Sequence, residues 1–213
     1  MLKLWGRNNS SNVKKVIWAC AELNIPFERI DVGGPFGGLN TDEYKAMNPM
    51  QLIPVIDDDG YVLWESNAIV RYLCAKHPQD PFWPSDVKVR GHADRWMEFQ
   101  ATTLGPALGP AFVQIVRFKP EDRDMKMIAA NIEKAAGLWK HVDRQLGATK
   151  WLAGEQFTFG DLPLGILMYT WDQLKLDDVG LAHHRQKLPN LWRWYEQLQA
   201  MKHYRDIVMI GLT

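Results

Sequence analysis

The sequence predicts an α/β domain followed by a larger domain made only of helices. Over the first 77 residues, short apolar segments typical of strands alternate with segments that have the apolar spacing of helices. Three prolines then fall within residues 77–86, "HPQDPFWPSD", a composition typical of a linker. The apolar segments that follow have helical spacing. We therefore expect one domain at 1–77, a linker at 78–86 and a second domain at 87–213.

Each element of the first domain has a local signal. Strands are expected at 1–5 and 27–32, and a strand pair within 52–65 that turns at Asp58-Asp59-Gly60. Helices are expected at 13–23, 41–47 and 66–76, with a glycine-rich loop, "GGPFGGLN", at 33–40. This order of strands and helices resembles a thioredoxin-like fold.

The second domain is expected to contain four clear helices. Apolar residues recur at helical spacing within 89–104, 123–146, 162–174 and 190–201. After the first of these, Gly105-Pro106 and Gly109-Pro110 are expected to kink or break the chain. The reason is that a proline removes a backbone hydrogen bond and clashes with the preceding turn.

Composition excludes some classes of function. The 25 lysine and arginine residues equal the 25 aspartate and glutamate residues, so net charge gives no reason to expect binding to nucleic acid or to an anionic membrane. No stretch approaches the ~18 uninterrupted apolar residues of a membrane span, and the first residues lack the pattern of a secretory signal. We therefore expect a soluble, cytoplasmic protein.

The cysteines and histidines do not indicate a metal site. Cys20 and Cys74 lie in apolar helical segments, belong to no Cys-x-x-Cys motif and are expected to be buried free thiols. His183-His184 has no metal-ligating residue at a useful spacing and is expected to be a loop pair. No metal cofactor is therefore expected.

Five small polar residues, "NNSSN" at 8–12, separate the first expected strand from the first expected helix. One of them is enough to cap a helix. Thioredoxin-like redox enzymes place a Cys-x-x-Cys motif at this point, but Ser10 to Val13 contain no sulfur. The stretch therefore predicts a site that stabilises the thiolate of another molecule. A hydrogen bond to a charged group contributes roughly 1.5–3 kcal/mol, which lowers a thiol pKa by about 1–2 units.

Two further motifs lie in the first domain. Pro54 in "LIPVI" cannot donate to a sheet ladder, which argues against an ordinary central strand. Glu65-Ser66-Asn67 opens the helix at 66–76, with Ser66 expected as its N-cap. Free N–H groups at a helix start also form a site for a carboxylate.

Three segments in order carry a family resemblance: the opening stretch, "NPMQLIPVIDDDGYVLWESNAIVRYL" at 48–73 and "FTFGDLPL" at 157–164. Over essentially its whole length the chain resembles the soluble glutathione transferase family. The resemblance implies a thioredoxin-like domain, an all-helical domain, a homodimer and glutathione as co-substrate. It also implies a cis Ile53-Pro54 bond that leaves the polar groups of Ile53 free to pair with the cysteinyl backbone of glutathione.

The resemblance also assigns roles to individual residues. It places the γ-glutamyl end of glutathione at Glu65 and Ser66. The serine-type pattern of the family matches the thiolate-binding residue to Ser10. A bacterial pattern, with a threonine followed two positions later by an asparagine, matches it instead to Asn12, with Ser10 in the place of the threonine. Ser11 is a third candidate.

One position departs from the family pattern. Many members carry a Lys or Gln before the (V/I)-P pair that contacts the glycyl carboxylate, and here that residue is Leu52. Gln51, Asn40 or another residue of the 33–40 loop is expected to take its place.

The acceptor substrate of the family lies against the first long helix of the second domain. An apolar cleft is expected to be lined there by Trp96, Phe99, Thr103, Phe112 and Arg117. An aromatic stripe at helical spacing is more often plain core, and Arg117 either meets an anionic substrate or faces solvent, so these alternatives stay open.

The segment 157–164 is interpreted as a folding element. Its S/T-x-x-D/E pattern places Thr158 at the N-cap and Asp161 at the third position of the next helix, with Phe157 packing on Leu162. Loss of either polar side chain is expected to lower stability and not chemistry.

Together these patterns predict a cytoplasmic, homodimeric glutathione transferase that attacks a small hydrophobic electrophile. Two alternatives stay open. One is a glutathione-dependent disulfide or peroxide reductase, and the other is a non-catalytic binding protein on the same fold.

Overall fold

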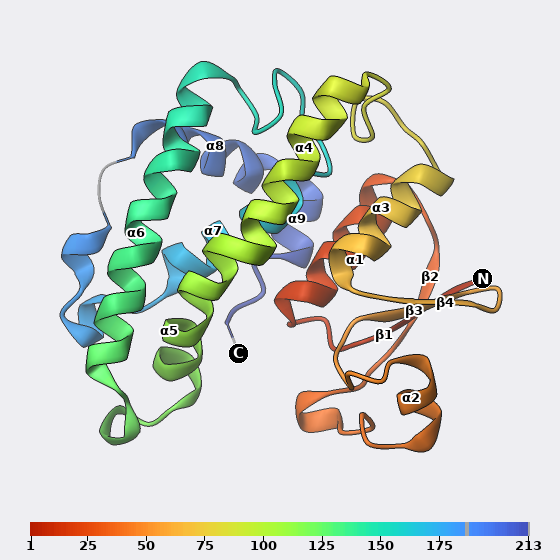
Figure 1. Ribbon diagram of the computed structural model, residues 1–213, viewed down its shortest axis with the longest axis horizontal. Helices are drawn as coiled ribbons and strands as arrows, with labels where there is room; N and C mark the ends of the chain where they lie inside the picture. The colour runs from red at the N-terminus through yellow and green to blue at the C-terminus, as the bar shows by residue number, and fades with distance from the viewer. Residues whose placement is uncertain (186–187, 213) are drawn as a thin grey trace.

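The computed structural model describes residues 1–185 and 188–212. The first domain contains a four-stranded sheet with strand order β2-β1-β3-β4. Its elements are β1 (Leu2–Trp5), α1 (Ser11–Glu22), β2 (Phe27–Ile30), α2 (Asp42–Met47), β3 (Val55–Asp58), β4 (Tyr61–Trp64) and α3 (Ser66–Lys76). β1 runs parallel to β2 and antiparallel to β3, and β3 runs antiparallel to β4. This is the thioredoxin-like arrangement that the sequence predicts, with α1 and α3 above the sheet in Figure 1 and α2 below it.

The described residues that follow the linker form a helical layer beside the sheet domain (Figure 1). Its helices are α4 (Val87–Phe99), α5 (Gly105–Arg117), α6 (Met125–Ala148), α7 (Asp161–Gln173), α8 (Pro189–Ala200) and α9 (Lys202–Ile207). Short 3₁₀ turns lie at Gly34–Phe36, Pro120–Asp122, Asp177–Val179 and Ala182–His184. The four helices that the sequence predicts are therefore confirmed as helices, whereas the residue limits of the domains stay a prediction.

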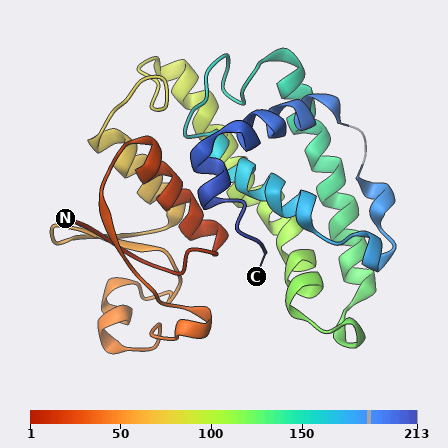
Figure 2. The same ribbon diagram turned by 180° about the vertical axis from the view of Figure 1, so that it is seen from behind.

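Helix α1 is the element that joins the two domains. It packs on α3 within its own domain and on α7 and α9 of the helical domain, as Figure 2 shows from behind. The ring of Trp18 lies 5.6 Å from that of Phe157 and 5.1 Å from that of Tyr204, so one apolar core crosses the domain boundary. Helix α1 consequently lies where the two domains meet.

The sequence predicts a kink or break at Gly105-Pro106 and Gly109-Pro110, and in the structure the regular α-helix is interrupted directly before Gly105 and continues through Pro110. A π-helical turn at Gln100–Leu104 connects α4 directly to α5, and Pro106 falls in the first turn of α5. A proline is tolerated there because the first N–H groups of a helix have no partner within it. Gly105 makes the turn possible, since a Cβ at this position would lie 2.6 Å from the Gln100 carbonyl oxygen.

The segment 157–164, interpreted from the sequence as a folding element, has the predicted pairing of Thr158 with Asp161 but a different helix start: the Asp161 carboxylate accepts from the Thr158 N–H, and the Thr158 hydroxyl accepts from the Gly160 N–H. Helix α7 begins at Asp161, so Gly160 and not Thr158 is its N-cap. The fully buried Asp161 carboxylate accepts hydrogen bonds from the backbone N–H groups of Leu152 and Thr158 and from the indole of Trp194. Phe157 stacks on Trp18 of α1. The segment thus ties a loop, α7, α8 and α1 together.

Candidate functional site

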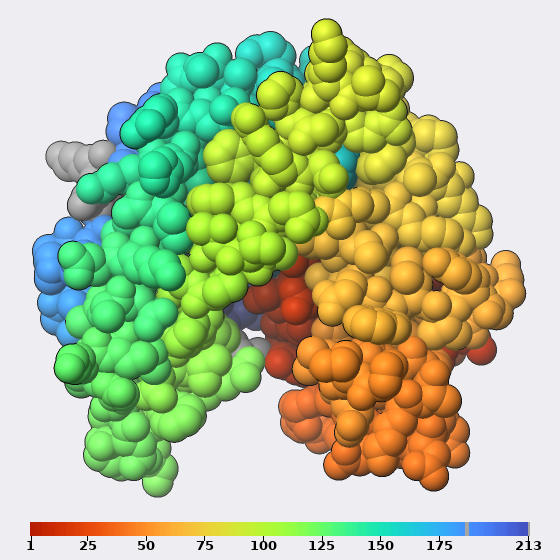
Figure 3. Space-filling view, viewed as in Figure 1, coloured from red at the N-terminus to blue at the C-terminus, as the bar shows by residue number. Residues whose placement is uncertain are grey.

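A cavity of about 590 Å³ lies between the two domains. It is bounded by the start of α1, the start of α3 and the segment from the end of α4 to the start of α5. The residues that line it are Asn12, Lys15, Glu65, Ser66, Asn67, Ala68, Arg71, Glu98, Gln100, Ala101, Gly105 and Pro106. In Figure 3 the red atoms of the N-terminal segment are visible at the bottom of the hollow between the two domains.

The start of α3 has an unusual backbone. Glu65, not Ser66, occupies the N-cap position, with φ 72° and ψ 109°. A positive φ is uncommon for a residue with a side chain, and such conformations cluster at ligand sites. Ser66 becomes the first residue of α3 and is 5% exposed. The first N–H groups of α3 therefore face the cavity without partners inside the helix, an arrangement that favours an anion.

A buried lysine lies beneath these groups. The Lys15 ammonium donates hydrogen bonds to Gln100 Oε1 at 2.7 Å, to Asn67 Oδ1 at 3.1 Å and to Ser66 Oγ at 3.4 Å. Burial lowers the pKa of Lys15 to about 7. The sequence patterns missed both Lys15 and Gln100 as site residues, although a charged residue inside the apolar part of a helix is a usable signal.

The three candidates at the start of α1 are placed differently. Ser10 is the N-cap of α1, with an extended backbone, and its side chain makes no capping hydrogen bond. Its hydroxyl is therefore not used by the helix. Of Ser10, Ser11 and Asn12, only Asn12 lines the cavity, where its Oδ1 accepts a 3.4 Å hydrogen bond from the Ser66 hydroxyl.

The Ile53-Pro54 bond is cis, as the family resemblance implies. The preceding loop is held by its carbonyl at Leu52, which accepts hydrogen bonds of 2.8 Å from the Tyr44 hydroxyl and from Asn48 Nδ2. Pro54 ends this loop directly before β3.

The residues predicted to contact the glycyl carboxylate of glutathione are not among those that line the cavity between the domains. The Leu52 side chain is 60% exposed. Gln51 has a positive φ of 55° and is partly exposed, and Asn40 is exposed before α2. The structure thus puts Gln51 and Asn40 on two loops beside the sheet.

The five predicted acceptor residues divide into two groups. Trp96 and Phe99 pack edge to face at 5.4 Å and line a separate cavity of about 600 Å³ between α4 and α6. They share it with Arg95, His141, Arg144, Gln145 and Ala148. Trp96 and Phe99 thus lie on the side of α4 that faces α6, and their role at an acceptor site stays a prediction.

The other predicted acceptor residues follow α4. Thr103 lies in the π-helical turn, with its hydroxyl 3.3 Å from that of Thr102. The Arg117 guanidinium lies 5.6 Å from the centre of the Phe112 ring. Burial lowers the pKa of Arg7 in the sheet domain, and the nearby charge of Arg117 lowers it further. Phe112 and Arg117 thus lie on α5 on the side that faces the sheet domain.

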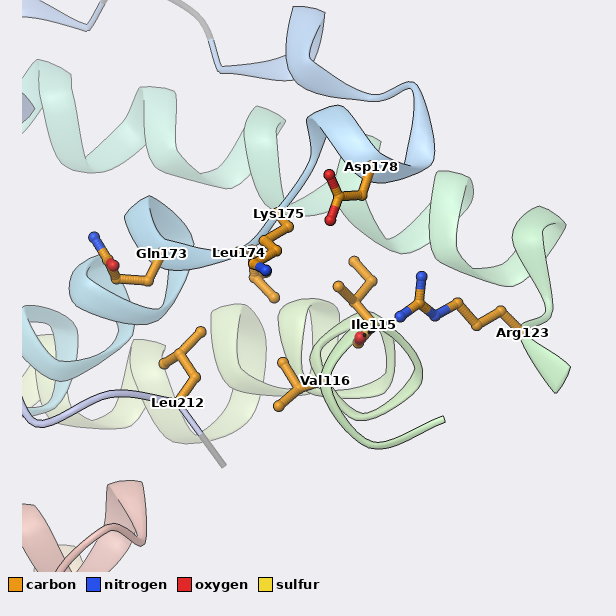
Figure 4. Close-up of a pocket in the computed structure, with 8 residues that line it drawn as sticks. All are labelled: Ile115, Val116, Arg123, Gln173, Leu174, Lys175, Asp178 and Leu212. Carbon is orange, nitrogen blue, oxygen red and sulfur yellow. Dashed lines mark hydrogen bonds between the residues drawn. The ribbon is translucent and has the colours of Figure 1, made fainter. Parts of the chain in front are cut away.

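A further cavity, of about 410 Å³, lies at the far end of α7 and is shown in Figure 4. It is lined by Ile115, Val116, Arg123, Gln173, Leu174, Lys175, Asp178 and Leu212. No residue assigned to the site from the sequence is among them.

The cysteines are buried and unpaired, as predicted. Burial raises the pKa of the Cys20 thiol to about 12 and that of Cys74 further. Within residues 1–185 and 188–212, no group of three or more His, Cys, Asp or Glu side chains is placed to hold a metal ion. No helix in the same part of the chain is long and apolar enough to cross a membrane.

Comparison with known proteins identifies the family to which the chain belongs. Residues 4–81 match the family model "Glutathione S-transferase, N-terminal domain", and residues 102–201 match "Glutathione S-transferase, C-terminal domain". "Glutathione S-transferase GstB" of Escherichia coli strain K12 is 40% identical over 215 residues, which span 100% of both chains. "Glutathione S-transferase F13" of Arabidopsis thaliana is 29% identical over 92% of this chain and 90% of its own.

A solved structure is also similar over the whole chain. It is that of the theta class glutathione S-transferase from Xanthomonas axonopodis pv. citri with glutathione bound. Its TM-score is 0.92 at 37% sequence identity, and the match covers 100% of this chain and 99% of that one.

Proposed function

The chain belongs to the glutathione S-transferase family, and from this premise we propose that it is an enzyme that stabilises the thiolate of bound glutathione at the start of α1. The thiolate then attacks a small hydrophobic electrophile. The observation that carries the proposal is the cavity in which the start of α3, Asn12 of α1 and the buried Lys15 come together. Its N–H groups and its cation suit a carboxylate, which glutathione carries at both ends.

In the proposed complex the γ-glutamyl carboxylate accepts hydrogen bonds from the N–H groups and the hydroxyl at Ser66. Glu65, beside it, suits the γ-glutamyl ammonium group. The backbone of Ile53, before the cis Pro54, pairs with the cysteinyl residue of the tripeptide. Gln51 and Asn40 are the candidates for the glycyl carboxylate, since Leu52 has no polar group.

The sulfur of a tripeptide held in this way lies toward the start of α1. Ser10 supports this role because its hydroxyl makes no bond to the helix, and Asn12 because its amide faces the cavity. One donated hydrogen bond contributes roughly 1.5–3 kcal/mol to the charged form. A thiol that titrates near 8.5 would then titrate about 1–2 units lower, so the thiolate becomes the major form at neutral pH.

Single replacement of Ser10, Ser11 and Asn12 by Ala tests this step. The thiol pKa of bound glutathione is read from the ultraviolet absorbance of the thiolate, and conjugation is measured with 1-chloro-2,4-dinitrobenzene. Loss of the donor is expected to raise the thiol pKa by about 1–2 units and to lower the rate at neutral pH by about tenfold or more. The assignment is overturned if the Ser10 and Asn12 variants both keep the wild-type pKa and rate.

The acceptor is proposed to bind on α5 and the π-helical turn, against Thr103, Phe112 and Arg117. These residues lie between the cavity and the end of α5, whereas Trp96 and Phe99 face α6. A small hydrophobic electrophile suits the Phe112 ring, because ligand sites are lined mainly by apolar and aromatic groups.

Two other functions are compatible with the same cavity. Glutathione-dependent reduction of a disulfide or peroxide predicts activity with hydroxyethyl disulfide and none with 1-chloro-2,4-dinitrobenzene. A non-catalytic binding protein predicts glutathione binding by calorimetry without either activity. The proposed function predicts both binding and conjugation.

We also propose that the chain forms a homodimer. Trp96 and Phe99 line the cavity between α4 and α6, and the large apolar side chains that the sheet domain exposes include Met50, Leu52, Tyr61 and Val62. Apolar surfaces of this kind mark protein interfaces. Sedimentation velocity tests the proposal, and a monomer at micromolar concentration would refute it. The cytoplasmic location expected from the sequence stays a prediction.

A further inference from the structure

Lys15 is the only lysine among the residues that line the cavity, and its side chain is almost inaccessible, at 4% exposure. Its three hydrogen bonds reach Ser66 and Asn67 at the start of α3 and Gln100 in the π-helical turn. The ammonium therefore joins the sheet domain to the helical domain directly beneath the first N–H groups of α3.

The hydrogen bonds of Lys15 fix the orientation of the Ser66 hydroxyl. An ammonium group has three donors and no acceptor, so Ser66 Oγ must be the acceptor in this pair. The hydroxyl hydrogen then points to another partner, and in the structure it is donated to Asn12 Oδ1 on the cavity wall. A carboxylate that takes the place of Asn12 Oδ1 as acceptor would receive this hydrogen.

The charge of Lys15 depends on the groups that surround it. Glu65 at the N-cap of α3 and Glu98 of α4 favour the ammonium, whereas Arg71 of α3 opposes it. Arg71 is itself bound to Glu98 and, at 2.5 Å, to Asp94. Burial outweighs these charges and lowers the pKa of Lys15 to about 7.

We propose that Lys15 is a positioning residue for the carboxylate that binds at the start of α3. In its charged form it holds the Ser66 hydroxyl as a donor, and the bound carboxylate in turn stabilises the charge on Lys15. Binding in the neutral to mildly alkaline range is then accompanied by proton uptake, and affinity falls as the pH rises above the pKa of the free site. This inference rests on the proposed function, in which that carboxylate belongs to glutathione.

The neighbouring Lys14 provides a matched control. It is equally buried, at 3% exposure, and burial lowers its pKa to about 8. Its ammonium donates instead to the Val208 carbonyl oxygen at 2.9 Å and does not line the cavity. Lys14→Met thus removes a buried ammonium from the same helix without touching the carboxylate site.

The experiment is calorimetric titration with S-methylglutathione, whose sulfur cannot titrate. Measurement in two buffers of different ionisation enthalpy, at a pH slightly above the pKa of Lys15, gives the number of protons taken up. The wild-type protein and Lys14→Met are expected to take up a fraction of a proton per ligand. Lys15→Met is expected to take up none and to bind about tenfold to a hundredfold more weakly.

The proposal is overturned if the wild-type protein binds without proton uptake, or if Lys15→Met keeps both the uptake and the affinity. The wild-type measurement needs no variant, so it decides the matter even if Lys15→Met fails to fold. Gln100→Leu adds a second variant, because it removes one acceptor of Lys15 and is expected to weaken binding while proton uptake persists. If S-methylglutathione does not bind the wild-type protein at all, the proposed function fails instead.

Discussion

Replacement of Asp161 by Ala should lower stability far more than activity. The carboxylate accepts from three buried N–H donors, on Leu152 at 3.1 Å, Thr158 at 3.0 Å and Trp194 at 3.0 Å. A buried donor left without a partner costs about 1–3 kcal/mol, so three give at least about 3 kcal/mol. For a chain of this size that corresponds to a fall in Tm of about 6–12 °C.

Thermal unfolding followed by tryptophan fluorescence measures this effect, and the KM for glutathione is measured well below the Tm. The Thr158→Val variant is the control. It loses only two 3.3 Å hydrogen bonds and should cost about 1 kcal/mol. A fall in Tm below about 2 °C for Asp161→Ala, or a changed KM in the folded variant, would show that the carboxylate is not a stability element.

The pH dependence of stability gives an independent check. Burial raises the pKa of Asp161 to about 6, whereas the group ionises near 3.8 in an unfolded chain. The part of the free energy of unfolding that is linked to this titration is therefore fully present below a pH of about 4 and is lost as the pH rises through about 6, a loss of roughly 3 kcal/mol. The three N–H donors keep their acceptor in either protonation state, so the cost of Asp161→Ala is a separate effect. In the Asp161→Asn variant, which cannot titrate here, this decrease in the free energy of unfolding between about pH 4 and 6 should be absent. An unchanged slope, measured by urea unfolding across this range, would contradict the reasoning.

Two further outcomes are expected. Cys20 and Cys74 should not react with iodoacetamide in the native protein at mildly alkaline pH, because burial raises both pKa values. Labelling as fast as in urea would contradict this. Gly105→Ala should weaken binding of S-methylglutathione, since its Cβ would meet the Gln100 carbonyl oxygen at 2.6 Å and displace an acceptor of Lys15. Gly109→Ala, which meets no atom within 4 Å, should bind normally, and equal affinities for the two variants would refute the role of the turn.

The parts of the fold that the sequence predicts correctly have strong local signals. The period of apolar residues identifies α1, α3 and α6 within a few residues of their bounds. The cis Ile53-Pro54 bond was predicted only through the family resemblance, because a proline alone is compatible with either isomer.

The departures from prediction lie where two local rules compete. Pro106 is expected to kink or break a helix; the regular helix is interrupted before it by a π-helical turn that no sequence pattern predicts, which places Pro106 in the first turn of α5, where its missing N–H costs nothing. Ser66 was expected as an N-cap, but Glu65 takes that position with a positive φ that no propensity scale favours. Both departures line the candidate cavity, in keeping with the tendency of irregular backbone to mark functional sites.

The two lysines of α1 show why a site can escape sequence reasoning altogether. Lys14 and Lys15 are adjacent, so their side chains point about 100° apart around the helix. Helix α1 is covered on both sides, by α3 and by α7 and α9, and each ammonium is therefore buried against a different partner. A hydrophobic pattern predicts which face of a helix is buried but not what lies on it. Lys15 reaches the carboxylate site because its side of α1 faces Ser66 and Asn67 at the start of α3 and Gln100 in a π-helical turn 85 residues away in sequence, partners that no local pattern predicts.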